Sequence, residues 1–450
     1  MPSLLDQSAL TDLAERLVAA AKRAGADAAD AIAVRAVSLS VDVRDGALEE
    51  SQRAEHDDVG LRVLVGRKQA VVSTSDIKGD GLDTLAERAV AMARAAPEDR
   101  FAGLAEPGLL ARDLPSLDLL DPDMASVEVL ERRARDAEAA ALAVPGVTKS
   151  GGASASSGIG GMVLVTSHGF TGTTISSNHA ISMSAIAGEG TGMETDYDYS
   201  STLHAADLES AETVGRSAGE RAVKRLNPRK VATRRVPVVF DHRIAGSLVG
   251  HLASAANGAA VARKTSFLRD KRGERIFAPG IDIIDDPLRR RGLRSRPFDA
   301  EGVAARVHKI VDDGVLQNWL LDCATARELD LQTNGHAQRG VSSTPSPAAS
   351  NLHLTAGRKS PGELIGEITD GFFVTSLIGM GVNMITGNYS RGASGFWIEN
   401  GELTFPVSEV TIAGPLLDMF RGLEPANDLQ FRYGTNAPTL RVEGLTVAGH

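Results

Sequence analysis

Two pairs of adjacent aspartates have the residue type that acid–base chemistry or the binding of a hard cation requires. They are Asp285 with Asp286, and Asp312 with Asp313. Each pair stands next to a turn residue, because Pro287 follows the first pair and Gly314 follows the second. Aspartate is common in turns, where its side chain accepts hydrogen bonds from nearby backbone N–H groups. We therefore expect both pairs to form turns rather than a catalytic site.

Three side chains could act as nucleophiles if their surroundings activated them. Cys323, the only cysteine, lies in an apolar segment, where a buried thiol is typically inert. Ser390 and Ser394 lie in a glycine-rich segment that indicates turns or close strand packing. An α/β-hydrolase would place Gly-x-Ser-x-Gly between a strand and a helix, and the predicted elements contain no such junction. The sequence thus predicts structural roles for all three.

Histidines could bind a metal, and a zinc peptidase usually presents two of them on one helix beside a proton-accepting glutamate. The ten histidines of this chain are scattered, and no predicted helix carries that pattern. His242 and His251 lie nine residues apart, on different turns around one predicted helix. We expect both to be capping or hydrogen-bonded surface imidazoles. Residues 188–192 resemble part of a dinucleotide loop, but no helix follows, so nucleotide binding is not expected.

The composition is that of an average globular protein. The length of the chain indicates more than one hydrophobic core. It has 450 residues, whereas single cores stop growing near ~250–300 residues. An excess of 58 acidic over 48 basic side chains gives a net charge of -10, which opposes direct binding to nucleic acid. The basic stretch at residues 225–235 has no aromatic side chain for base stacking, so we interpret it as a linker.

Several features predict a soluble cytoplasmic protein without membrane contact. A single cysteine excludes an intramolecular disulfide and suits a reducing compartment. The first residues lack the basic stretch and apolar core of a signal peptide. No apolar run approaches the ~20 residues that a membrane-spanning helix needs.

The pattern of elements predicts an α+β fold in which a helix, four strands and a helix occur twice. Residues 8–24 and 82–95 have apolar positions at helical spacing, with four alternating stretches between them. The second copy has one helix that Asp123 or Ser126 caps and that runs to Leu142, another that Asp207 caps and that runs to about Leu226, and four further stretches between them. Each copy alone would form a small antiparallel sheet in need of helical cover, and together they could form one larger sheet-and-helix layer.

The character of the chain changes near residue 230, after the linker Asn227-Pro-Arg-Lys230. We predict an N-terminal domain of helices and antiparallel sheet over residues 1–230. A β-rich domain with one short helix, over residues 244–256, is predicted for residues 231–450. Asn400-Gly401, between apolar strands, predicts a hairpin in this second domain.

Three long segments carry a specific resemblance. They are Asn318-Trp-Leu-Leu-Asp-Cys-Ala-Thr-Ala-Arg-Glu-Leu329, Leu377-Ile-Gly-Met-Gly-Val-Asn383 with Thr386-Gly-Asn-Tyr-Ser-Arg-Gly-Ala-Ser-Gly-Phe-Trp-Ile-Glu-Asn-Gly401, and Asn436-Ala-Pro-Thr-Leu-Arg-Val-Glu-Gly-Leu-Thr-Val-Ala-Gly449. In them the chain resembles the PmbA (TldE) branch of the TldD/PmbA family. The helix-and-sheet pattern of residues 1–226 is compatible with that resemblance.

The resemblance implies that this chain lacks a zinc site that its family partner has. The TldD subunit is similar to a zinc metallopeptidase whose ligands come from a His-Glu-x-x-x-His helix and a later cysteine. Carried over by position, Gly250, His251 and Ala255 stand in place of the helix motif, and Gly392 stands near the place of the cysteine. Such a chain could not by itself hold zinc or activate water.

The resemblance also implies a heterodimer with a TldD-type zinc subunit that processes peptides or unfolded proteins, while this chain binds no cofactor. Peptides could add as strands to an exposed sheet edge. The run of residues 379–395 would face the partner or the peptide, with tight strand packing as the alternative. Its candidate residues are Gly379, Gly381, Asn383, Ser390 and Arg391.

Two other functions stay open at this point. One is a regulatory binding protein that acts without proteolysis, which the family's older label of gyrase modulator implies. The other is a peptidase with a rearranged metal site.

Overall fold

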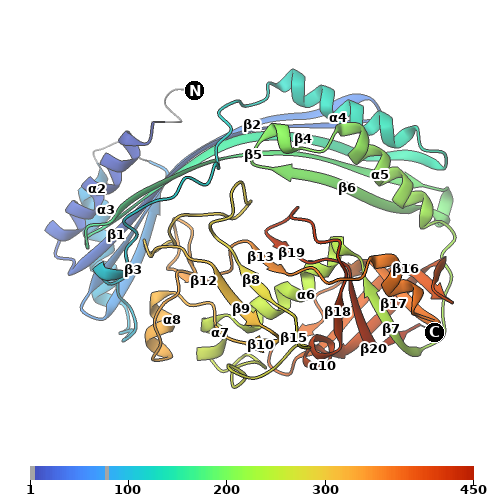
Figure 1. Ribbon diagram of the computed structural model, residues 1–450. Coiled ribbons are helices and arrows are strands. Elements are labelled where there is room, and N and C mark those ends of the chain that lie inside the picture. Colours follow the sequence, from blue (N-terminus) through green and yellow to red (C-terminus); the bar gives the residue numbers. More distant parts are fainter. Residues whose placement is uncertain (1–5, 77–80, 450) are drawn as a thin grey trace.

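The N-terminal half of the chain forms one long, curved antiparallel sheet with helices on its convex face (Figure 1). The computed structural model describes residues 6–76 and 81–449. The elements are α2 (Ser8–Arg23), β1 (Ala28–Arg44), β2 (Ala47–Val65), β3 (Lys68–Thr74), α3 (Leu82–Ala95), the 3-10 turn η2 (Pro107–Leu109), α4 (Val127–Leu142), β4 (Val147–Thr166), β5 (Thr171–Ala187), η3 (Gly190–Gly192), β6 (Glu194–Thr202), η4 (Ala205–Asp207) and α5 (Ala211–Lys224).

The predicted repeat is visible in the structure, but with three strands in each unit of the described chain rather than four. Two of the stretches that we predicted separately run together in β2, and two others run together in β4. The ladder continues through both expected breaks, since Ala54 pairs with Ser38 and Gly160 pairs with Ala36. The first strands of the two units, β1 and β4, pair with each other, so the sheet order is β3-β2-β1-β4-β5-β6.

Local signals set the ends of most of these elements. The hydroxyl of Ser126 accepts a hydrogen bond from the Val129 N–H and caps α4, so of the two predicted caps Ser126 is the one used, and not Asp123. We had expected Asp207 to cap helix α5, but Ser210 caps it. Asp207 lies in the separate turn η4. Glycine permits the two outer helices to touch: a Cβ atom at position 215 of α5 would stand 2.0 Å from the Ala137 carbonyl oxygen of α4.

The C-terminal half is rich in strands, which confirms the predicted α+β class. Its elements are β7 (Arg234–Phe240), α6 (His242–Ala255), α7 (Gly258–Ala262), β8 (Ile283–Asp285), β9 (His308–Asp312), β10 (Val315–Leu316), α8 (Cys323–Glu328), β11 (Ala337–Gln338), β12 (Ser346–Pro347), β13 (Leu352–Leu354), α9 (Pro361–Gly366), β14 (Asp370–Ile378), β15 (Val382–Asn383), β16 (Asn388–Glu399), β17 (Glu402–Pro415), α10 (Leu416–Arg421), β18 (Leu423–Pro425), β19 (Thr435–Asn436) and β20 (Leu440–Ala448). Helix α6 is the one that the sequence predicted, and α7 to α10 have only five or six residues each. We keep residue 230, between α5 and β7, as the proposed domain boundary.

Strands β14, β7, β20, β17 and β16 close into a small barrel. Strand β14 pairs with β7 on one side and with β16 on the other, and β20 and β17 complete the ring. The predicted hairpin is confirmed: Asn400 and Gly401 join β16 to β17 with φ angles of 51° and 83°. Two predicted strands near residues 403–406 and 410–413 form the single strand β17. Phe240, Phe372 and Leu252 belong to the same buried core, so α6 packs directly on the barrel.

Buried ion pairs join the sheet to the C-terminal half. The Asp30 carboxylate of β1 accepts hydrogen bonds from Arg62 of β2 at 2.5 Å and from Arg339 at 2.6 Å. All three side chains are almost fully buried. At Gly60, a Cβ atom would stand 1.8 Å from the Val341 carbonyl oxygen, so only glycine permits this approach. Because an unpaired buried charge costs several kcal/mol, these contacts hold the two halves in one arrangement.

No helix within residues 6–76 and 81–449 has both the length and the apolar character needed to cross a membrane.

Candidate functional site

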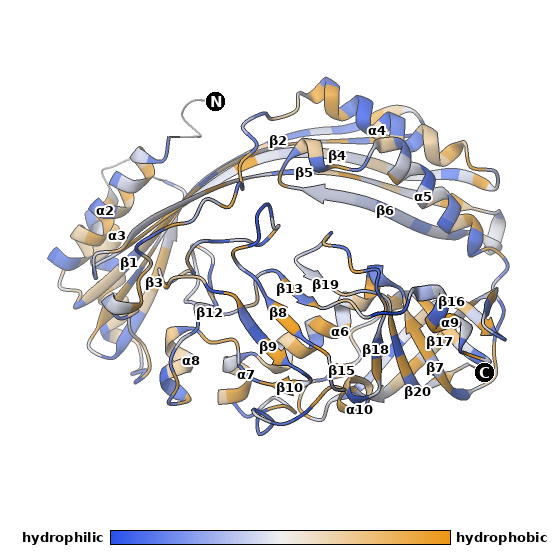
Figure 2. Ribbon diagram, in the orientation of Figure 1, coloured by the Kyte–Doolittle hydropathy of each residue, from blue (hydrophilic) through white to orange (hydrophobic). Residues whose placement is uncertain are grey.

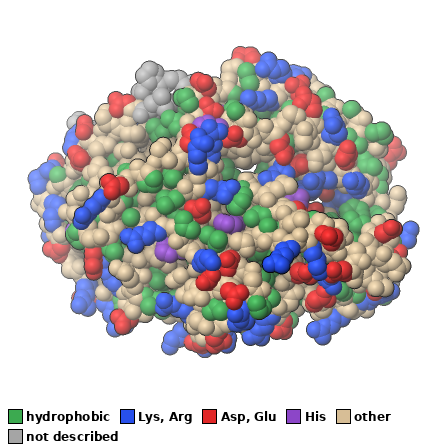
Figure 3. Space-filling model, viewed as in Figure 1, with side chains coloured by type: hydrophobic (Ala, Val, Ile, Leu, Met, Phe, Trp, Pro, Cys, Tyr) green, Lys and Arg blue, Asp and Glu red, His purple; other side chains and the backbone are tan. Residues whose placement is uncertain are grey.

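A cleft separates the concave side of the sheet from the C-terminal half. A cavity of about 390 Å³ lies in this cleft, lined by residues of β6 and of the C-terminal half. A second cavity, of about 590 Å³, is lined by residues of the C-terminal half alone, and Thr435 lines both. Helix α6 contributes to each cavity, with Gly246 and Ser247 in the first and Gly250 in the second. Figure 3 shows the surface opening between the two layers, with basic side chains beside the opening. Strands β5 and β6 above the cleft are pale in Figure 2, since small and polar residues make up most of both strands.

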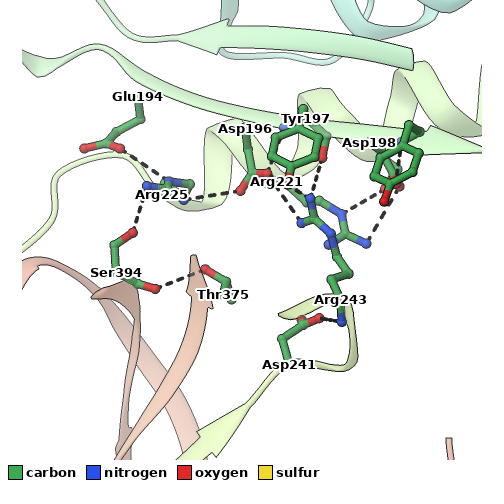
Figure 4. A network of polar contacts seen from close by, with 12 residues as sticks. Glu194, Asp196, Tyr197, Asp198, Arg221, Arg225, Asp241, Arg243, Thr375 and Ser394 are labelled. Atoms are coloured by element: carbon green, nitrogen blue, oxygen red, sulfur yellow. Dashed lines mark hydrogen bonds and ion pairs between the residues drawn. The ribbon is translucent and has the colours of Figure 1, made fainter. Parts of the chain in front are cut away.

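Strand β6 forms the edge of the sheet at the cleft, and side chains cap its backbone (Figure 4). The carbonyl oxygens of Tyr197 and Tyr199 accept hydrogen bonds at 2.7 Å from Arg243 and Arg432, respectively. The N–H groups of the same tyrosines donate to the side chain of the aspartate that precedes each, at 2.8 Å. An edge whose donors and acceptors are already paired does not accept an added strand at these residues.

Arg225, directly after α5, ties the same strand to the barrel (Figure 4). Its guanidinium donates to the Ser394 hydroxyl at 3.0 Å and lies 3.4 Å from the carboxylates of Glu194 and Asp196. The Ser394 hydroxyl is buried and used as an acceptor in this contact. Ser394 therefore has the structural environment that the sequence predicted.

The positions that correspond to the family's zinc ligands lie in different settings. Gly250 lines the second cavity, and a Cβ atom there would meet no described heavy atom within 4 Å. Ala255 is fully buried in the core, and Gly392 pairs with Ile378 in the barrel. Across the described ranges, no three His, Cys, Asp or Glu side chains lie together in a group that could hold a metal ion. The residues at these positions do not fit a zinc ion.

Four polar side chains form a cluster beside these positions, which we call the α6–β16 cluster. Ser247 and His251 come from α6, and Tyr389 and Arg391 come from β16. Each has a buried atom without a hydrogen-bond partner in the described structure: Ser247 Oγ, His251 Nε2, Tyr389 OH and Arg391 Nε. The rings of His251 and Tyr389 meet edge to face with centroids 5.8 Å apart. Our prediction of a surface imidazole at His251 was wrong, because α6 turns that side chain toward the barrel.

Burial sets the charge of the ionisable members of this cluster. Burial, and then the nearby positive charge of Arg391, lower the pKa of His251 to about 4. Burial raises the pKa of the Tyr389 hydroxyl above its ordinary value, although Arg391 opposes this. Near neutral pH, His251 and Tyr389 are therefore uncharged hydrogen-bonding groups beside one guanidinium.

The structure separates the five candidates of the glycine-rich run. A Cβ atom on Gly381 would stand 1.7 Å from the Ser390 carbonyl oxygen, so this glycine serves tight packing. The Asn383 side chain accepts hydrogen bonds from two backbone N–H groups of its own turn. Gly379 has a φ of 82° and is exposed, as is Ser390. Arg391 lines the first cavity.

The other chemical candidates occupy structural positions. The buried Asp285 carboxylate accepts hydrogen bonds from Ser350 and lies 3.1 Å from His336. Asp313 lies in a turn with a φ of 46°. Cys323 is buried, and burial together with the charge of Glu301 raises the pKa of its thiol, which is therefore protonated at neutral pH.

The letters Gly-x-Ser-x-Gly do occur at residues 215–219, but inside helix α5 rather than between a strand and a helix. The Ser217 hydroxyl donates to the Asp198 carboxylate at 2.5 Å. The flanking glycines permit close contact with α4, since Cβ atoms there would approach backbone carbonyl oxygens of α4. The match is therefore a packing feature.

Sequence reasoning missed Arg243 and Arg432, which cap β6. The only signal in the sequence was the Asp-Tyr-Asp-Tyr alternation of residues 196–199, which indicates an edge strand whose two faces differ. Nothing in the sequence connects that alternation to arginines 46 and 233 residues away.

The fold is that of a two-layer α+β protein, in which a duplicated curved sheet faces a closed barrel across a cleft. Three family models match it: PmbA/TldA metallopeptidase domain 1 over residues 29–93, the central domain over residues 120–226 and the C-terminal domain over residues 233–449. The chain belongs to the PmbA/TldD metallopeptidase family.

Sequence and structural similarity to individual proteins supports this family assignment. The chain is 36% identical over 425 residues to the protein named metalloprotease PmbA of Escherichia coli O157:H7, covering 94% of this chain and 92% of that protein. A Bacteroides thetaiotaomicron structure described as a "putative modulator of DNA gyrase" is 27% identical, with a TM-score of 0.90 and 98% of both chains covered. TldE of Thermococcus kodakarensis shares the fold, with a TM-score of 0.86, 20% identity, and 97% and 99% of the two chains covered.

Proposed function

We propose that this chain is the metal-free subunit of a heteromeric metallopeptidase that processes peptides and unfolded proteins. Helix α6 carries the proposal: in a metallopeptidase family, it presents Gly250, His251 and Ala255 where a metal-binding helix would present its ligands. His251 is the only one of the three with a ligating side chain, and it is directed into the α6–β16 cluster. Zinc would then be held by a TldD-type partner, and this chain would bind no cofactor of its own.

The loop from β14 to β16 is the surface that we assign to the partner. Met380 is 95% exposed, Ile378 68% and Ile385 63%. Large apolar side chains gathered in one short exposed segment are typical of an interaction surface. Gly379 and Ser390 are exposed in the same region.

The cleft is the place that we assign to the peptide. The backbone groups of Tyr197 and Tyr199 at the β6 edge are already hydrogen-bonded, so a peptide strand would have to pair with another edge.

A reconstitution experiment tests the proposed function. The chain, a TldD-type partner from the same cells and the mixture are each incubated with an unfolded peptide, and products are followed by mass spectrometry. We expect cleavage by the mixture only. Cleavage by the partner alone at the full rate would overturn the subunit role, and cleavage by this chain alone with stoichiometric zinc would establish a rearranged metal site.

Substitutions in the partner loop test the interface. Met380→Lys should weaken the complex in analytical ultracentrifugation, because it places a charge in an apolar contact. Met92→Lys on α3 is the matched control, since Met92 is also exposed but lies on the sheet layer. Equal affinity of the two variants for the partner would place the interface elsewhere.

A regulatory role without proteolysis is the alternative, and it accords with the name of the Bacteroides protein. It predicts a stable complex without peptide cleavage in the same reconstitution. We place either activity in the cytoplasm, where the lone buried thiol of Cys323 suits reducing conditions.

A further inference from the structure

The first cavity of the cleft is lined by arginines that differ in their pairing. Arg225 and Arg243 both make ion pairs with Asp196. Arg391 lines the same cavity, yet its guanidinium makes no hydrogen bond or ion pair with any residue that the structure describes. A guanidinium at a cavity wall with its planar donors unused matches the geometry of a carboxylate.

The neighbours of Arg391 supply further hydrogen-bonding groups. Tyr389 lies two residues earlier on the same face of β16, is 2% exposed, and has an unpaired hydroxyl. Ser247 lines the cavity and has an unpaired hydroxyl of its own. The Nε2 atom of His251 is also buried without a partner, and the His251 ring meets the Tyr389 ring edge to face.

We propose that the α6–β16 cluster binds a carboxylate group at the wall of the first cavity. Arg391 supplies the positive charge and two parallel donors, while the hydroxyls of Tyr389 and Ser247 donate to the remaining lone pairs. Buried polar groups are normally paired, so four unpaired ones in one cluster, of which Ser247 and Arg391 line the cavity, indicate a ligand that completes them. The charge of Arg391, which makes no ion pair with any carboxylate that the structure describes, opposes the binding of a cation beside it.

The carrier of the carboxylate is a peptide, through its free C-terminus or through an acidic side chain. This choice of carrier rests on the proposed function, whereas recognition of the carboxylate itself rests only on this chain. The cavity of about 390 Å³ accommodates one or two residues of such a peptide beside the bound group.

Calorimetric titration of the full-length chain without a partner tests the proposal. Three probes are compared: N-acetyl-trialanine with a free C-terminus, the same peptide as its amide, and N-acetyl-Ala-Glu-Ala-amide. We expect one or both acids to bind and the trialanine amide to bind at least about tenfold more weakly. Which acid binds tighter identifies the source of the carboxylate.

Variants of the cluster separate recognition from folding. Arg391→Gln should weaken the acid by about tenfold or more, and Tyr389→Phe, which keeps the ring, by a smaller factor. Arg421→Gln is the matched control, since this exposed arginine lies on α10. Circular dichroism in the near ultraviolet checks that each variant keeps its tertiary packing.

An independent readout is the imidazole of His251. A carboxylate bound beside it should raise its pKa from about 4, as measured by NMR titration of labelled histidine. Equal binding of acid and amide, no binding of either acid up to about 10 mM, or unchanged binding by Arg391→Gln would each overturn the proposal. Because no partner is present, these outcomes are distinct from failure of the reconstituted peptidase.

Discussion

The guanidinium of Arg243 donates a hydrogen bond to the carbonyl oxygen of Tyr197 at 2.7 Å, and so joins the first turn of α6 to the free edge of β6. The same group lies 3.4 Å from the Asp196 carboxylate and stacks over the Tyr197 ring at 5.1 Å. Helix α6 carries residues of both cavities, so this contact positions the wall of the cleft relative to the sheet.

Arg243→Met should lower the free energy of unfolding by about 2–4 kcal/mol, because it leaves Asp196 and the Tyr197 carbonyl oxygen short of a partner in a buried setting. Urea-induced unfolding measures this loss. Arg421→Gln, whose parent side chain is exposed and lies 4.0 Å from Asp418, should change stability by less than about 0.5 kcal/mol. Equal losses in the two variants would show that the α6–β6 contact is not a stabilising one.

His251 should make the protein sensitive to acid. Its pKa is about 4 in the folded chain, against the ordinary imidazole value of 6.5, so between these values the unfolded chain binds a proton that the folded chain does not. Stability therefore falls as the pH drops from about 6.5 to about 4, by up to about 3 kcal/mol. His251→Gln should remove this part of the loss in urea unfolding at pH 7 and pH 4.5. The exposed His56→Gln variant should keep the wild-type dependence.

Glu301 should have the opposite effect. Burial raises its pKa to about 7, with Asp299 adding to the rise and Arg62 opposing it. The folded chain thus retains a proton that the unfolded chain loses above about pH 4.5, and stability falls as the pH rises from about 4.5 to about 7. Glu301→Gln keeps an acceptor for the Cys323 N–H without titrating. Relative to wild type it should gain stability between pH 5 and pH 8, and Glu328→Gln on the exposed side of α8 should not.

Two glycines in helices should respond to alanine with opposite signs. Gly250→Ala adds a Cβ atom into open space and should stabilise the protein by about 0.5–1 kcal/mol, since glycine is a poor helix former. Gly215→Ala places its Cβ atom 2.0 Å from a carbonyl oxygen of α4 and should cost about 1–3 kcal/mol. Thermal unfolding of both variants checks the prediction. A destabilised Gly250→Ala would mean that position 250 is not open to the second cavity.

Features that depend on neighbouring residues were accessible from the sequence. The hairpin at Asn400 and Gly401 and the cap at Ser126 follow from the conformational needs of a few adjacent residues. Strand continuity was harder to predict. The glycines of β4 looked like breaks, but pairing on both sides keeps residues 147–166 in one strand.

The sequence by itself determined that helix α6 lacks the side chains of a zinc motif, because the identity of a ligand does not depend on its neighbours. Only the tertiary structure decided what stands there instead. Tyr389 and Arg391 meet His251 across more than a hundred residues of chain, and Arg339 meets Asp30 across 309. Such pairs are selected by the packing of α6 and the sheet against the barrel, where burial makes each unpaired charge costly. The spacing of residues along the chain therefore does not predict which of them form these buried contacts.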